Sequence, residues 1–390
     1  MKHLLFALAL SASLMTYAQK EFGFINAEKI LRNAPDSVFN STSSFAAYLE
    51  EWFDNDEDLL RGIFVWITKS ISYDVDNMYR IRYYEQPGEL IEKTFLTRKA
   101  ICQGYAELFN EFCHQTGIQS YVVHGYTKQN GAISNTGHAW IVAKSNGNWY
   151  CFDPTWGAGY IQDGKFVRSF SPEYFMAKPE DFIASHMPLD PMWQCLNQPF
   201  SIQDFYLGER KQEKENVNYA FVDSINDYIQ LNRIQQYKVA LRRIEENGIR
   251  NDVILDYARF LEQTLENAEL QNKYEYQNQM VEKLNEAVIH YNNGGTLFNR
   301  YISFYNRQFK PAIPDVEIQG MLETSEKEIK NSKEILAGIN PFSSDMKRNI
   351  NQLMAAIKDL QYLVDEQRVF LRKYMTTSRA YRGKLFWKHH

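Results

Sequence analysis

The chain has 390 residues, of which 44% are hydrophobic and 23% are charged, and its formal net charge is −5 at pH 7. This length allows two domains with separate cores, and this composition excludes wholesale disorder. A mildly acidic chain has no general attraction for nucleic acid, so we predict no nucleic-acid partner.

The first residues have the pattern of an export signal. Lys2 and His3 precede an apolar run, Leu4–Met15, and Thr16-Tyr17-Ala18 supplies small residues where a signal peptidase cleaves. We therefore predict a signal peptide over residues 1–18, a mature chain that starts at Gln19, and a periplasmic or secreted location. No other stretch of about 18 apolar residues occurs, so no transmembrane segment is predicted.

The cysteines restrict the kinds of site that can be present. Four cysteines are too few for a disulfide scaffold, and they show no paired CxxC spacing, so neither a structural zinc site nor any other metal or cofactor is predicted. A bridge between Cys151 and Cys195 is conceivable, but the sequence leaves the disulfide state of Cys113, Cys151 and Cys195 open.

Two buried helices are predicted in the first part of the chain. Apolar residues recur at helical spacing from Leu59 to Ile71 and predict a helix over Asp56–Ser70. A second helix is predicted to start at Cys102 and to end before Gly117. Its buried face consists of Cys102, Tyr105, Ala106, Phe109, Phe112 and Cys113.

Three β-like runs follow, at Tyr121–Tyr126, His138–Lys144 and Trp149–Asp153. The dipeptide Asn146-Gly147 predicts a tight hairpin between the second and third runs. That hairpin places Trp140 opposite Asp153 and His138 opposite Thr155. His138 and Asp153 then become diagonal neighbours on one face of the ribbon, because side chains alternate with a period of two.

From about residue 215 to its end the sequence is predicted to be almost entirely helical, with a join near Gly208. Amphipathic stripes predict long helices, including one that contains Met280, Leu284 and Tyr291 and is expected to stop at Gly294-Gly295. We predict a domain over residues 19–207 and a helical bundle over residues 208–390. The role of the bundle is open, although its helices could bind a protein partner.

Cys102, His138 and Asp153 have the residue types of a catalytic triad. A carboxylate can fix the tautomer of an imidazole, whose other nitrogen then accepts a proton from a thiol. At a helix start, unpaired backbone N–H groups favour the thiolate and can hold an oxyanion. Each residue alone is more often a core cysteine, a surface histidine or a turn aspartate, so the inference depends on their combination.

Several segments resemble transglutaminase-like domains, in particular the bacterial and kyphoscoliosis-peptidase-like branch. Their motifs are similar to Arg98–Ala106, Gly137–Trp140 and Trp149–Trp156, together with the entry helix at Ile63–Asp74, within a motif core of about residues 50–160. The resemblance implies an α+β papain-like core, followed here by an all-α C-terminal domain. It also implies Cys102 as nucleophile, His138 as base and Asp153 as the residue that orients it. Ala100 departs from the family, which usually has glycine there.

Further positions are candidates for oxyanion stabilisation or substrate positioning, namely Gln103, Trp66, Tyr73 and Trp140. For Trp66, packing in the core is the favoured alternative. The leading hypothesis is an exported cysteine-dependent enzyme that forms a thioester with protein or peptide amides, with hydrolysis slightly favoured over cross-linking. The alternative is a non-catalytic binding module with a helical interaction domain.

Overall fold

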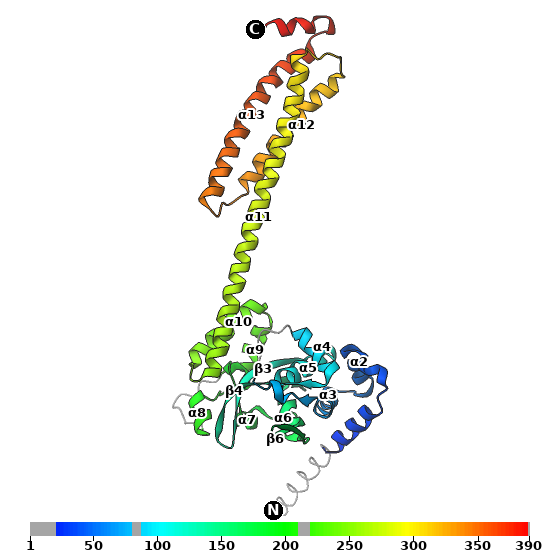
Figure 1. The fold of residues 1–390 in the computed structure, drawn as a ribbon, viewed down its shortest axis with the longest axis vertical. Helices are drawn as coiled ribbons and strands as arrows, with labels where there is room; N and C mark the ends of the chain where they lie inside the picture. The colour runs from blue at the N-terminus through cyan, green and yellow to red at the C-terminus, as the bar shows by residue number, and fades with distance from the viewer. Residues whose placement is uncertain (1–20, 80–86, 210–218, 389–390) are drawn as a thin grey trace, which may run out of the picture. The chain divides into compact units, whose positions relative to one another are not determined.

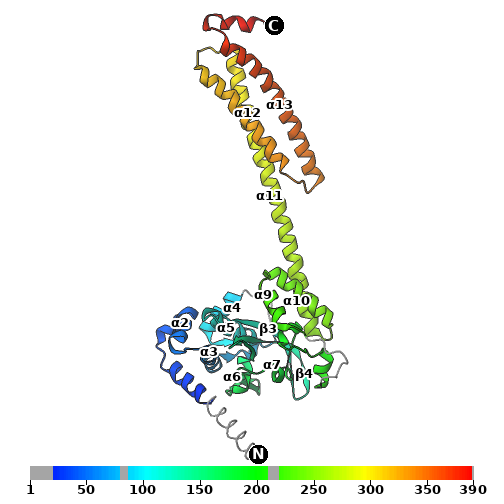
Figure 2. The ribbon, with the colours of Figure 1, turned by 180° about the vertical axis from the view of Figure 1, so that it is seen from behind.

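The computed structural model describes residues 21–79, 87–209 and 219–388 (Figures 1 and 2). The chain divides into two compact units, one ending at Glu266 and one starting at Asn267. The predicted signal peptide lies outside the described residues. No helix among the described residues is both long and apolar enough to cross a membrane.

The first unit is a mixed α+β structure, as predicted. Its helices up to the predicted boundary at residue 208 are η1 (Asp36–Asn40), α2 (Thr42–Trp52), α3 (Asp56–Ser70), η2 (Val75–Asn77), α4 (Pro87–Thr97), α5 (Cys102–Gln115), α6 (Pro154–Ala158), η3 (Pro172–Tyr174), α7 (Pro179–Phe182), η4 (Pro191–Gln194) and α8 (Ile202–Leu207). Its strands are β1 (Ser72–Tyr73), β2 (Lys99–Ala100), β3 (Ser120–Gln129), β4 (Ala132–Ser145), β5 (Asn148–Phe152), β6 (Gly159–Gln162), β7 (Lys165–Arg168) and β8 (His186–Pro188).

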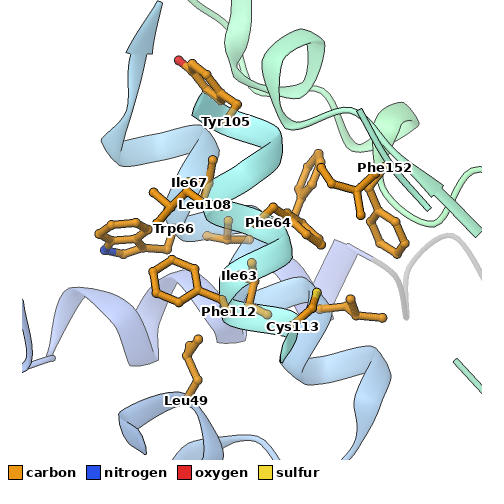
Figure 3. Packing of buried hydrophobic residues seen from close by; sticks show 14 of the residues in the cluster. Leu49, Ile63, Phe64, Trp66, Ile67, Tyr105, Leu108, Phe112, Cys113 and Phe152 are labelled. Carbon is orange, nitrogen blue, oxygen red and sulfur yellow. The ribbon is translucent and has the colours of Figure 1, made fainter. Parts of the chain in front are cut away.

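Helices α3 and α5 form the centre of the first unit and confirm the two predicted helices. The side chain of Asn55 caps α3 by accepting from the Asp58 N–H, and Gly117 follows α5 with a positive φ of 73°. The apolar faces of both helices meet in one core with the inner face of the sheet. Figure 3 shows this packing, in which the Cys113 sulfur lies among the side chains of the core.

The main sheet has the strand order β5-β4-β3-β8. In the β4–β5 hairpin Ile141 pairs with Phe152 and Ser145 pairs with Asn148. This is the register that Asn146-Gly147 predicts, and both turn residues have positive φ.

Two details of these strands differ from the prediction. The third strand ends at Phe152 instead of Asp153, because the Asp153 carboxylate caps α6. The first two strands also extend past the predicted runs, because Lys128–Thr136 continues the β3–β4 ribbon around a tight turn at Asn130-Gly131.

A short parallel pair brings the end of α3 next to the start of α5. In this pair Tyr73 of β1 lies beside Ala100 of β2. Gly104 keeps the first turn of α5 close to β2, since an added Cβ would lie 2.6 Å from the Ala100 Cβ. Any larger residue at Gly104 would therefore push the helix start away from Tyr73.

Helices α9 (Phe221–Ile229), α10 (Arg233–Asn247) and the first part of α11 (Asp252–Asn306) also belong to the first unit. Ile225 of α9 packs with residues of β3–β5, and Ile244 of α10 packs with Tyr126 of β3. The first unit therefore has a helical extension past residue 208.

The second unit is helical and contains the rest of α11 together with α12 (Asp315–Ala337), α13 (Ser344–Thr376) and η5 (Arg379–Lys388). The predicted helix stop at Gly294-Gly295 is wrong, because α11 runs through both glycines. Gly294 instead lets α12 approach closely: an added Cβ would lie 3.1 Å from Ile329, and the Ser325 hydroxyl donates to the Gly294 carbonyl at 2.8 Å. Tertiary packing here outweighs the low helix propensity of glycine.

Candidate active site

Cys102 is the first residue of α5 and is only 3% exposed. The residue before it, Ile101, has no side-chain acceptor, so it does not cap the helix. The first backbone N–H groups of a helix have no partner within the helix. The sulfur therefore lies beside N–H groups that Ile101 leaves uncapped.

His138 and Asp153 are in direct contact. The Nε2 atom of His138 on β4 lies 2.8 Å from Oδ2 of Asp153. The other oxygen of Asp153 accepts from the backbone N–H groups of Thr155 at 2.8 Å and Trp156 at 3.1 Å. The same carboxylate thus caps α6 and fixes the imidazole, as the predicted diagonal pairing requires.

The charges of this pair stabilise each other. Burial by itself acts to lower the pKa of His138, but the Asp153 carboxylate and, after it, the nearby Cys102 side chain raise it to about 10. Burial acts to raise the pKa of Asp153, yet the imidazole of His138 and a second histidine hold it well below its usual range. Because Nε2 of His138 contacts Asp153, Nδ1 is the ring nitrogen that this carboxylate leaves free.

The second histidine, His186 on β8, was not anticipated from the sequence. Its Nε2 lies 3.1 Å from the same Oδ2 atom of Asp153, and its side chain is fully buried. It reaches the site because β8 pairs with β3, with His186 opposite Thr127. A strand of three residues has no local periodicity, and this one lies far from Asp153 in the sequence. The one sequence signal for His186 is the presence of a histidine within an apolar stretch.

The other predicted positions are placed as follows. Tyr73 lies close enough to Cys102 and Asp153 for their charges to raise its pKa, although burial is the larger cause. Trp140 is buried with its ring centroid 6.2 Å from that of His138. Gln103 is buried in the first turn of α5.

Trp66 lies in the core, as its alternative interpretation predicts. Its ring packs against Phe45 at 4.5 Å and Phe112 at 5.6 Å between centroids, and the Arg98 guanidinium lies 4.5 Å from its centroid. Figure 3 shows the indole beside Phe112.

A cleft of about 500 Å³ opens beside the site. Tyr73 and His138 line it, while Cys102 lies behind them and does not. Its other walls come from the β3–β4 ribbon, the β6–β7 hairpin and η3, through residues that include Gln129, Thr136, Trp156, Tyr160, Phe166, Glu173 and Tyr174. The cleft wall is therefore both aromatic and polar.

The ligand atoms of His138, Asp153 and His186 lie within 4.8 Å of one another, a spacing that could in principle hold a metal ion. However, both histidines direct Nε2 at one carboxylate oxygen at hydrogen-bond distance. Donor atoms around a metal would point at a common centre instead. The cluster has the geometry of a hydrogen-bonded network.

The remaining cysteines are buried free thiols. Burial raises the pKa of Cys113 to about 12 and raises the pKa values of Cys151 and Cys195 above the usual range. Such thiols are poor nucleophiles near neutral pH.

The raised pKa of His138 predicts how stability depends on pH. A histidine whose folded pKa exceeds its unfolded value of 6.5 stabilises the fold fully below pH 6.5, and this contribution is lost as pH rises through about 10. The difference in unfolding free energy between wild type and His138→Gln should therefore be largest near about pH 6 and shrink toward about pH 10. Urea unfolding at several pH values measures it, and a difference that grows with pH would contradict the ion pair.

Comparison with known proteins identifies the domain. Residues 43–154 match the family model of the transglutaminase-like superfamily. The kyphoscoliosis peptidase of Mus musculus is 32% identical over 160 residues, 39% of this chain and 24% of that protein. Hillarin of Drosophila melanogaster is 24% identical over 170 residues, 38% of this chain and 20% of that protein. The matches thus span about a quarter or less of these relatives.

Among solved structures, a putative cysteine protease from Cytophaga hutchinsonii is 17% identical, covering 36% of this chain and 48% of that chain with a TM-score of 0.25. The family-model match covers Cys102, His138 and Asp153 and ends before His186. Residues 43–154 are therefore a transglutaminase-like superfamily domain, in an α+β unit that is followed by a mostly helical C-terminal region.

Proposed function

We propose that the chain is a cysteine-dependent acyl-transfer enzyme that acts on protein or peptide amides, with hydrolysis as its main outcome. One arrangement supports the proposal: the imidazole of His138 contacts the Asp153 carboxylate at 2.8 Å, and the side chain of Cys102, the first residue of α5, is close enough to help raise its pKa. This arrangement provides a nucleophile, a proton carrier and a group that orients the carrier.

The reaction proceeds in two halves. The Cys102 thiolate attacks the amide carbonyl carbon and forms a C–S bond, and His138 donates its proton to the nitrogen as the C–N bond breaks. The amine or ammonia leaves, and a thioester remains. Water then attacks the thioester with His138 as base, the C–S bond breaks, and the products are a carboxylic acid and the free thiol.

The oxyanion formed in each half needs hydrogen-bond donors. The backbone N–H groups of Cys102 and Gln103 are the nearest candidates, since they belong to the uncapped first turn of α5. The packing of Trp66 in the core makes its indole a weaker candidate. A substrate carbonyl would approach from the cleft, past Tyr73 and His138.

Hydrolysis is favoured over cross-linking because water greatly outnumbers amines in an open cleft. The β3–β4 ribbon contributes Gln129, Ser134 and Thr136 to the cleft wall, so this ribbon would control access of an amine. We further propose that the protein is exported by its first 18 residues, and N-terminal sequencing should then find Gln19 first. The C-terminal helices remain a proposed surface for a protein partner.

The test is incubation with a glutamine-rich unfolded protein, with and without a primary alkylamine. The expected result is release of ammonia or new peptide ends in both cases, with little amine incorporated. Incorporation without hydrolysis would reverse the preference for water. The absence of all products, with Cys102→Ala indistinguishable from wild type, would support a binding module instead.

A further inference from the structure

A continuous line of hydrogen bonds extends behind the proposed triad. The Ser185 hydroxyl lies 2.8 Å from Nδ1 of His186, and Nε2 of His186 lies 3.1 Å from Oδ2 of Asp153. That oxygen also accepts from His138 at 2.8 Å. The carboxylate thus has four donors in total, two of them imidazoles and two of them backbone N–H groups.

These contacts fix the tautomer of His186. An ionised carboxylate can only accept hydrogen bonds, so Nε2 of His186 must carry a proton. If the ring is neutral, Nδ1 is an acceptor, and the Ser185 hydroxyl is placed to donate to it. The Asp153 carboxylate thus selects this tautomer, and the Ser185 hydroxyl, which also lies 3.4 Å from the Phe182 carbonyl, complements it when it donates to Nδ1.

The surroundings of His186 disfavour a charged ring. The side chain is fully buried and stacks on Phe182 at 3.9 Å between centroids, with Trp156 at 4.6 Å on another side. Burial lowers its pKa to about 4, even though the bond to Asp153 acts in the opposite direction. A neutral donor is also chemically useful here, because an imidazolium at this position would repel the nearby His138 cation.

We propose that His186 is a positioning residue of the acyl-transfer site, which as a neutral Nε2–H donor holds the Asp153 carboxylate in place and keeps it ionised. The inference rests on the proposed function. It assigns a role to a residue that lies beyond the matched family model, which ends at residue 154.

A measured pH profile of this network also depends on the titratable side chains that surround it. The titratable neighbours of Asp153, His138 and His186 are Cys102 and Tyr105 on α5, Tyr73 on β1 and Tyr174 on η3. All three tyrosines have raised pKa values, mainly through burial, so they stay neutral below about pH 10. Helix α7, which carries Phe182, adds the exposed Glu180 and Asp181.

The experiment compares His186→Phe with His186→Gln. Phenylalanine retains the ring on Phe182 but removes the donor, while glutamine retains an N–H donor. The readout is the pH profile of the rate at which iodoacetamide alkylates Cys102. The acid limb reports loss of the thiolate–imidazolium pair, which Asp153 supports only while it is held beside His138, so the acid limb in His186→Phe should move up by about one pH unit, and His186→Gln should restore most of the wild-type profile.

A control is His124→Phe on β3, a partly buried histidine whose pKa burial lowers to about 4. It should change stability without moving the acid limb. If Cys102 reacts as proposed in wild type but the His186→Phe profile coincides with it, the role of His186 is refuted while the proposed function stands. If Cys102 in wild type is no more reactive than the other thiols, the proposed function itself fails.

Nitrogen NMR of the wild-type histidine rings tests the same inference without a variant. We expect a neutral His186 ring protonated at Nε2 between about pH 6 and 8. An imidazolium, or a ring protonated at Nδ1, would overturn the assignment even if both variants failed to fold.

Discussion

Replacing Cys102 by alanine is expected to lower the rate of amide cleavage by about 10⁴-fold or more, because no other described thiol combines a helix start with a contact to an imidazole. The unfolding free energy should change by only about 1 kcal/mol, since alanine suits the first turn of a helix and the lost sulfur is small. Product formation and chemical unfolding measure the two quantities separately.

Cys113→Ala is the matched control for this variant. Cys113 lies on the same helix, is fully buried in the core and is far down the apolar face from the site. Its replacement should weaken the fold by about 1 kcal/mol and leave the rate per folded molecule unchanged. A Cys102→Ala protein that keeps its activity would remove the nucleophile from the mechanism.

Asp153→Asn is expected to lower activity by about 10⁴-fold and the unfolding free energy by about 3 kcal/mol. The amide can still accept from the Thr155 and Trp156 N–H groups through one oxygen. Its NH2 group, however, would face the Nε2 donors of two histidines. His138 would have to change tautomer, and its Nδ1 could no longer take a proton from the thiol.

Asp190→Asn separates the two effects of that change. Asp190 is another buried carboxylate with an ionic partner among the described residues of the first unit, and Arg243 donates to both of its oxygens, at 2.8 and 2.6 Å. Breaking this pair should cost a comparable amount of stability. It should not affect the rate per folded molecule, so equal losses of activity in the two variants would indicate that Asp153 acts only through stability.

The parts of the site that local sequence determines could be predicted. Asn146-Gly147 determines the turn, the turn determines the register, and the register places His138 diagonal to Asp153. The apolar face that starts at Cys102 likewise predicts α5, because its spacing depends only on the helical period.

The parts that depend on distant contacts could not be predicted. His186 joins the site through pairing of β8 with β3, and a three-residue strand carries no periodic signal. The local sequence predicts that a helix ends at Gly294. In the structure the helix continues, and the close approach of Ile329 and Ser325 requires a small residue at this position. The Asp153 carboxylate ends β5 one residue early by capping α6, a role that its motif does not reveal.

The most direct test of the account is the alkylation rate of each thiol by iodoacetamide near neutral pH, with the modified residues mapped by mass spectrometry. The exposures of Cys102, Cys151 and Cys195 are all 3%, so burial alone predicts equally slow reaction. We predict that Cys102 reacts about 100-fold faster than the others and that His138→Gln abolishes this difference. Equal, slow alkylation of all four cysteines in the wild-type protein would contradict the account.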